Sequence, residues 1–199
     1  MADETAAVSG EKGVPSKADA GVAGADVPVA GGEAGVAEER LEVQRTIPAD
    51  AATIFRLLCD PRGHVAIDSS GMLMDAEGEP VKAVGDSFVV HMDREALNDY
   101  PMGLYDVTVT IKTLLPDREI AWTILGQIRP QIGHVYGYIL EPVDGGTLVT
   151  SYYDWSTISQ EWRDARIFPV IPESALRATL GILARTVAPG KPRPALSPQ

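Results

Sequence analysis

The chain has 199 residues, with 28 acidic and 17 basic side chains and a formal net charge of −11. Neither nucleic acid nor an anionic membrane surface suits such a chain as a partner, because both require a concentrated basic face. No stretch approaches the roughly 18 apolar residues of a membrane span, and no basic segment followed by an apolar run marks export. Cys59 is the only cysteine, so no intramolecular disulfide can form, and we predict a cytoplasmic protein.

Residues 1–40 differ in composition from the rest of the chain. They contain no Leu, Ile, Phe, Tyr or Trp, and they carry eight acids against three bases. Such a segment cannot bury enough apolar surface to offset its chain entropy. We therefore predict a disordered acidic tail over 1–40, one domain over 41–188 and a flexible Pro-rich tail over 189–199. The acidic tail either keeps the domain soluble or docks a protein partner.

The domain begins with a strand at 41–47 and two short helices. Pro48 closes the strand, and Asp50 is a suitable N-cap for a first helix whose apolar residues recur at helical spacing up to Leu58. A second helix begins at Pro61, because proline is well tolerated in the first turn of a helix.

Alternating strands follow the helices. We predict a brief strand at 72–74 and longer ones at 87–92, 105–111 and 120–124. In the strand at 87–92 one face carries Phe88, Val90 and Met92. His91 falls on the other face, where we expect it to be exposed.

The segment 133–156 is typical of a β-hairpin, because Asp144-Gly145-Gly146 accepts the positive φ of a tight turn. A two-residue loop at Asp144-Gly145 predicts three cross-strand pairs on one face: Tyr138 with Ser151, Tyr136 with Tyr153, and His134 with Trp155. A loop at Gly145-Gly146 would shift the pairs and keep this face. A three-residue loop would instead place Tyr152 and Asp154 on this face.

A long amphipathic helix ends the domain at 172–187, with Leu176, Leu180 and Leu183 on one stripe. The connection at 158–171 resembles a lid or a crossover more than a strand. Together the elements predict an α+β fold in which a curved antiparallel sheet of six to seven strands wraps around this helix.

Six short phrases occur in the order found in helix-grip proteins. They are Ile47-Pro48-Ala49-Asp50, Leu58-Cys59-Asp60-Pro61, Ala83-Val84-Gly85-Asp86-Ser87-Phe88, Pro116-Asp117-Arg118-Glu119-Ile120-Ala121-Trp122, Gly145-Gly146-Thr147-Leu148-Val149-Thr150 and Tyr153-Asp154-Trp155-Ser156. Over 41–188 the chain thus resembles the SRPBCC/START-like superfamily, nearest to actinobacterial polyketide cyclase/dehydrase family proteins. The resemblance implies a cavity between the sheet and the long helix, and it does not specify a reaction.

The predicted lining of that cavity combines aromatic, aliphatic and polar side chains. The candidate ligand-binding residues are Phe88, Val90, Met92, Tyr105, Trp122, His134, Tyr136, Tyr138, Tyr153, Trp155, Leu176 and Leu180. Such a lining suits a lipid or a flat ring compound with hydroxyl or keto groups. The alternative is that these rings fill the space and leave no room for a guest.

Three functions follow from this interpretation. The first is a carrier or sensor of a small hydrophobic molecule. The second is a polyketide cyclase or dehydratase in which His134 is the acid/base, Tyr136 or Tyr138 is near enough to share its proton, and a tyrosine hydroxyl steadies the enolate. The third is a protein-interaction module. We predict no cofactor and no metal, because His64, His91 and His134 match no ligand spacing. His64 is expected to pack or to cap its helix.

Overall fold

A computed structural model describes residues 39–95, 101–188 and 190. Most of the two predicted tails, 1–38 and 191–199, therefore lies outside the described residues, and so does any docking role for residues 1–40. Within the described ranges, no helix combines the length and the apolar content that a membrane span requires.

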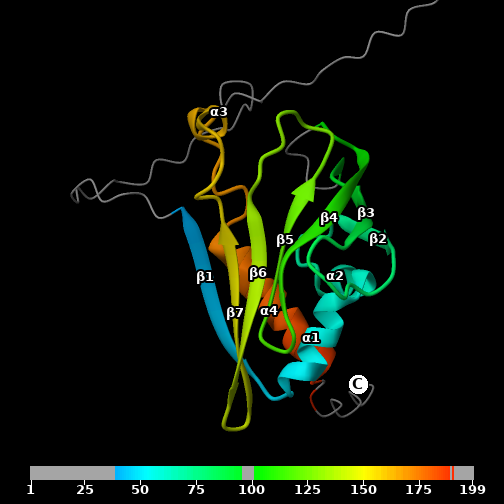
Figure 1. The fold of residues 1–199 in the computed structure, drawn as a ribbon, viewed down its shortest axis with the longest axis vertical. Helices are drawn as coiled ribbons and strands as arrows, with labels where there is room; N and C mark the ends of the chain where they lie inside the picture. Colours follow the sequence, from blue (N-terminus) through cyan, green and yellow to red (C-terminus); the bar gives the residue numbers. More distant parts are fainter. Residues whose placement is uncertain (1–38, 96–100, 189, 191–199) are drawn as a thin grey trace, which may run out of the picture.

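The elements appear in the predicted order (Figure 1). They are β1 (Arg40–Ile47), α1 (Ala51–Cys59), α2 (Pro61–Ile67), β2 (Leu73–Glu77), β3 (Ser87–Asp93), β4 (Leu104–Leu115), β5 (Glu119–Leu125), β6 (Val135–Val143), β7 (Gly146–Asp154), α3 (Gln160–Asp164) and α4 (Glu173–Val187).

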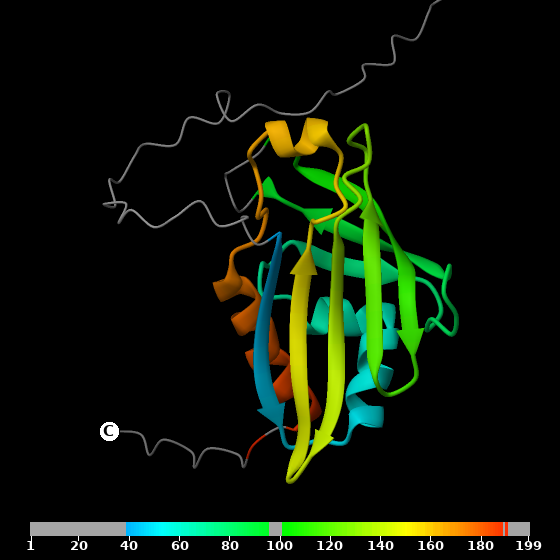
Figure 2. The ribbon, with the colours of Figure 1, turned by 60° about the vertical axis from the view of Figure 1, so that its left-hand side comes forward.

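The seven strands form one antiparallel sheet in the order β1-β7-β6-β5-β4-β3-β2. All the larger helices lie on one side of it, as Figure 2 shows. α4 contacts β1 and β7, α2 contacts β2 and β3, and α1 contacts β5 and β6. This is the predicted helix-grip architecture, in which a curved sheet holds the C-terminal helix against its inner face.

The predicted helix starts are confirmed by their capping bonds. Asp50 accepts a hydrogen bond from the backbone N–H of Thr53 at 2.7 Å and caps α1. Asp60 accepts from the backbone N–H of Arg62 at 2.9 Å and caps α2, whose first residue is Pro61. Each carboxylate satisfies a backbone donor that has no partner inside the helix.

The hairpin between β6 and β7 has the predicted two-residue loop at Asp144-Gly145. The last pair before the loop joins Val143 to Gly146, and the register places Tyr136 opposite Tyr153 and Tyr138 opposite Ser151. The ladder ends at Val135 and Asp154, so the predicted His134–Trp155 pair lies one step beyond it.

Two elements differ from the prediction. β2 spans Leu73–Glu77 instead of 72–74, and its pairing with β3 has an irregularity between Leu73 and Asp75. The connection 158–171 contains a short helix, α3, that the sequence did not indicate.

The lower half of the space between sheet and helices is packed core. Ile47, Ile54 and Leu58 are completely buried, and they meet Leu180 and Leu183 of α4, which are 1% and 0% exposed. These side chains fix the helices against the sheet, so the arrangement at the other end is held on a rigid base.

Candidate functional site

The predicted strand residues of the site all lie on the inner face of the sheet. Cross-strand pairs join Met92 to Tyr105 and Trp122 to Tyr136, and the hairpin continues the same face to Tyr153. Because side chains alternate along a strand, one observed cross-strand pair determines which of the strand's other side chains lie on the same face. The face predicted from alternation is thus the observed one, and whether it holds a ligand stays a prediction.

Rings on this face form a continuous group, here called the aromatic belt. Neighbouring ring centroids are 4.6 to 6.4 Å apart. The belt comprises His64, Phe88, Trp122, His134, Tyr136, Tyr138, Tyr153, Trp155 and Phe168. It runs across the sheet from β3 to the segment before α4.

Several belt rings stack on each other. Tyr136 and Tyr153 are cross-strand neighbours whose planes differ by 24° at a centroid distance of 4.6 Å, and Trp122 stacks on the other side of Tyr136 at 21°. Strand side chains stand roughly perpendicular to their sheet, so stacked neighbours direct ring edges and hydroxyl groups inward. Ring edges carry partial positive charge and favour the π faces and oxygen atoms of a guest.

His134 and Tyr153 form the polar centre of the belt. Nδ1 of His134 lies 2.9 Å from the Tyr153 hydroxyl. The backbone carbonyl of His134 accepts a hydrogen bond from the Thr123 hydroxyl at 2.8 Å, which fixes the residue at the start of β6. Burial lowers the pKa of His134 to about 4, so its imidazole is neutral at pH 7.

Tyr153 is completely enclosed, and burial raises the pKa of its hydroxyl. Around this hydroxyl lie the Tyr136 hydroxyl and the backbone of Val170. Burial also raises the pKa of Tyr136 and Tyr138. The belt's ionisable groups are therefore all held in their uncharged forms.

The other ring nitrogen of His134 faces accessible space. Among the described residues, no fully enclosed side-chain nitrogen or oxygen lacks a hydrogen-bond partner. Nε2 of His134 has no partner in that part of the chain, so it reaches space that water can enter. The same reasoning applies to the indole nitrogens of Trp122 and Trp155, which are 8% and 7% exposed.

Several side chains at the upper end of the inner face keep accessible surface. Tyr105, Ile124 and Tyr136 are half-buried although they point toward the helices, whereas Phe88 and Val90 are enclosed in the core below. Half-buried Ile128 and Ile132 lie above them in the β5–β6 connection. We refer to the space around Tyr105, Ile124, Tyr136 and Nε2 of His134 as the recess.

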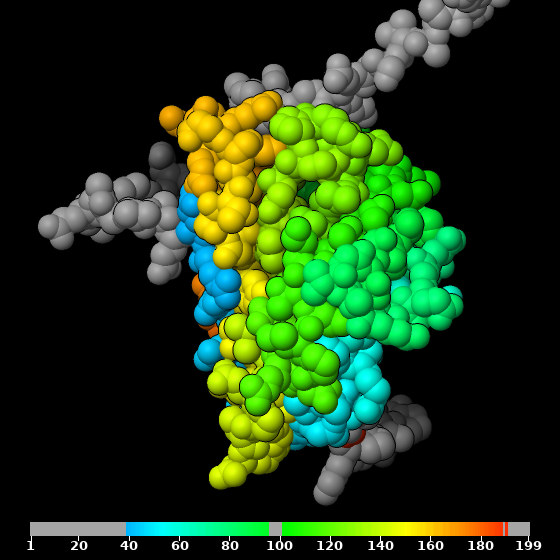
Figure 3. Space-filling view, in the orientation of Figure 1, coloured from blue at the N-terminus to red at the C-terminus, as the bar shows by residue number. Residues whose placement is uncertain are grey.

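The segment between β7 and α4 closes over this end of the molecule. Trp162 of α3 is completely buried, and its indole N–H donates to the carbonyl of Pro130 in the β5–β6 connection at 3.2 Å. Arg163 pairs with Glu39 just before β1. Figure 3 shows α3 beside the β5–β6 connection at the same end. Phe168 and Val170, which reach the belt from this segment, were missed because no periodicity marks them.

The other two histidines are placed as the sequence suggested. His64 is buried in α2, and its Nε2 donates to the carbonyl of Leu58 at 2.8 Å. His91 lies on the outer face, with Nδ1 2.7 Å from Asp106 and Nε2 3.3 Å from Glu77. Within the described ranges, no three His, Cys, Asp or Glu side chains gather as a metal site.

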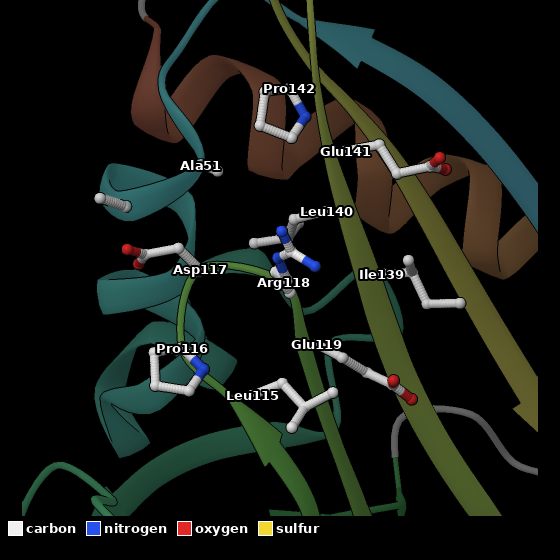
Figure 4. Close-up of a pocket in the computed structure, with 11 residues that line it drawn as sticks. Ala51, Leu115, Pro116, Asp117, Arg118, Glu119, Ile139, Leu140, Glu141 and Pro142 are labelled. Carbon is white, nitrogen blue, oxygen red and sulfur yellow. The ribbon is translucent and has the colours of Figure 1, made fainter.

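A separate groove of about 910 Å³ lies outside the inner face, where the start of α1 meets the β4–β5 turn and the end of β6 (Figure 4). It combines exposed apolar side chains, such as Leu115, with charged ones from Asp117 to Glu119. None of the candidate ligand-binding residues lines it. The groove and the recess are therefore different features.

Known structures share this fold at low sequence identity. Protein CV1439 from Chromobacterium violaceum is 16% identical, with a TM-score of 0.55 over 76% of this chain and 99% of that one. Ms6760 from Mycobacterium smegmatis is 13% identical, with a TM-score of 0.55 over 80% and 98%. The Aha1 dimer from Colwellia psychrerythraea is 17% identical, with a TM-score of 0.51 over 77% and 98%.

These similarities support the helix-grip fold, and at such identities they support the fold alone. No protein-family model matches the chain, and no curated protein matches it. The function is consequently argued from the recess itself.

Proposed function

We propose that the protein binds a small hydrophobic molecule, a lipid or a polyketide-like ring compound, in the recess above the aromatic belt, as a carrier or sensor. The observation that carries the proposal is the exposure of Tyr105, Ile124 and Tyr136, which keep accessible surface on a face that the helices otherwise cover. A guest placed there would gain about 25 cal/mol for each Å² of apolar area removed from water.

Polar groups are present in small number, as in sites that orient an otherwise apolar guest. Nε2 of His134 and the indole N–H groups of Trp122 and Trp155 lack hydrogen-bond partners among the described residues. Each can bond to one oxygen or nitrogen of a guest. A guest with one or two such atoms would therefore be held in a defined orientation.

Filling the recess tests the proposal. Ile124→Trp places a large ring where Ile124 now leaves space, and we expect it to abolish binding of N-phenyl-1-naphthylamine, an uncharged fluorescent probe. Ile139→Trp is the matched control, because Ile139 is also half-buried but belongs to the outer groove. Equal probe binding by wild type and Ile124→Trp would contradict the proposal. If Ile124→Trp loses probe binding as expected, native mass spectrometry of protein purified gently from its host identifies the natural guest class.

A second candidate function, a polyketide cyclase or dehydratase, is favoured by the contact of 2.9 Å between His134 and Tyr153. A neutral imidazole bonded at Nδ1 leaves Nε2 able to exchange a proton with a substrate, which is the role of a general acid/base. Tyr153, which the sequence did not pair with His134 in this role, would orient the imidazole. Tyr138, the other catalytic candidate from the sequence, lies on the same face, and its hydroxyl is hydrogen-bonded to Ser151.

Kinetics separates the two candidates. If the protein is an enzyme, His134→Ala should remove turnover of a poly-β-keto model substrate while the substrate still binds. Tyr153→Phe should lower kcat more than it changes KM, because the imidazole loses its partner. A carrier would show no turnover in wild type and only a modest change of affinity in either variant.

A further inference from the structure

We propose that the recess selects an uncharged guest and rejects the ionised form of the same molecule. The inference rests on the proposed function, since it concerns the guest of the same recess. It distinguishes a neutral ring ketone, quinone or alcohol from a fatty acid or an amine.

The inner face of the sheet carries no charged residue across its five central described strands. From Phe88 in β3 to Trp155 after β7, each side chain on this face is aliphatic, aromatic, His, Ser or Thr. Acidic and basic residues of these strands, such as Asp106 and Lys112, belong to the outer face or to the irregular step in β4. No described strand side chain of β3 to β7 can therefore pair with an ionic guest from below.

The helices that cover the face are also apolar on the side that they turn toward it. α4 directs Leu176 and Leu180 inward, whereas its charged Glu173 and Arg177 are exposed and pair with each other. α1 buries Ile54, Phe55, Leu58 and Cys59, and α2 contributes His64. The described helix faces that turn toward the sheet therefore carry no charge that could pair with an ionic guest.

The imidazoles do not supply a cation at neutral pH. Burial lowers the pKa of both His64 and His134 to about 4, and Asp60, the charged group that acts on His64, offsets only part of this shift. A guest anion in the recess would meet the neutral ring of His134, which offers a hydrogen bond and no net charge.

Described cations lie at the margins, among them exposed Arg129 of the β5–β6 connection, whose guanidinium donates to the carbonyls of Gly126 and Ile128. Arg45, on the edge strand β1, is exposed and its guanidinium lies beside Gly181 of α4. Arg94 follows β3, is half-buried, and its charge acts on the Tyr136 hydroxyl, though more weakly than burial does. Arg94 has contacts of its own.

Three guests with one ring system test the inference on the wild-type protein. They are 9-anthracenemethanol, anthracene-9-carboxylate and protonated 9-(aminomethyl)anthracene, titrated at pH 7 by isothermal calorimetry. We expect the alcohol to bind and both ions to bind at least about tenfold more weakly, because an unpaired charge loses its hydration in an apolar space.

Each other result has a distinct meaning. Equal or tighter binding of the carboxylate overturns the inference and leaves the proposed function standing. Equal binding of the amine overturns the inference in the same way. Failure of all three guests to bind overturns the proposed function together with the inference.

A variant with reversed selectivity provides the second test. Ile124→Lys introduces a long basic side chain at the half-buried inner position of β5, and we expect it to improve carboxylate binding at least about tenfold relative to wild type. Ile139→Lys, on the outer face, is the control and should leave the order of the three guests unchanged. Circular dichroism is the control for folding of both variants. An unchanged preference in folded Ile124→Lys would contradict the inference.

Discussion

The phenol ring of Tyr152 covers Gly137, its cross-strand neighbour in the β6–β7 ladder, on the outer face of the sheet. The ring is held in place, because its hydroxyl donates to Glu119 at 3.0 Å and the Arg40 guanidinium lies over its face, 4.0 Å from its centroid. A Cβ at position 137 would collide with this ring. The glycine is therefore required by packing on the face opposite the recess.

Gly137→Ala should destabilise the protein by about 1–3 kcal/mol, the usual cost of overpacking a fixed position. Chemical denaturation measures the change. The matched background is Tyr152→Ala, in which the added methyl group has room and the same substitution should cost little. An equal cost in both backgrounds would show that the ring is not the cause.

His91 should make stability fall at alkaline pH. Asp106, and then Glu77, raise its pKa above the ordinary 6.5 in the folded chain. The stabilisation is complete below 6.5 and is lost as the pH rises through the raised pKa. His91→Gln should remove this dependence in denaturation curves measured from pH 5 to 9. A wild-type slope that persists in the variant would assign it to another group.

His134 should have the opposite effect on the acid side. Its folded pKa of about 4 lies below the ordinary 6.5, so the unfolded chain binds a proton first as the pH falls. Stability should therefore decrease from pH 6.5 toward 4, by on the order of 3 kcal/mol for this group.

His134→Gln should flatten the slope over this window. His64 provides a second source of the same slope, because burial lowers its pKa to about 4 as well. A slope as steep in His134→Gln as in wild type would mean that the imidazole is not protected from protonation.

Trp162 should control how firmly α3 is held. Trp162→Phe keeps a buried ring but removes the N–H bond to Pro130, and we expect a loss of about 1 kcal/mol and faster amide exchange in 156–172. Trp155→Phe is the comparison, since its indole nitrogen has no partner among the described residues. Equal exchange rates in wild type and Trp162→Phe would rule out this anchoring role.

Features that depend on neighbouring residues in the sequence could be predicted. Asp50 and Asp60 mark helix starts through a side chain that bonds its own backbone, and Gly145, with φ 83, marks the hairpin loop. Alternation then places Tyr136 and Tyr153 on one face without knowledge of the helices.

Features that depend on distant contacts could not be predicted. α3 is held by the contact of Trp162 with Pro130, 32 residues away in the sequence, and no pattern in its five residues indicates a helix. Phe168 joins the belt through the same segment. Alternation likewise identifies the inner face but not which part of it the helices cover, so it does not separate enclosed Val90 from half-buried Ile124.

The pairing of β1 with β7 has a consequence for biosynthesis. Arg40 bonds to Asp154, 114 positions later, and α4 follows only after that. During translation the part of β1 and β7 that α4 covers stays exposed until that helix has been made, whereas α1 and α2 are already present to cover β3, β5 and β6. Such late, long-range closure predicts slow folding and a dependence on chaperones while the chain is still growing.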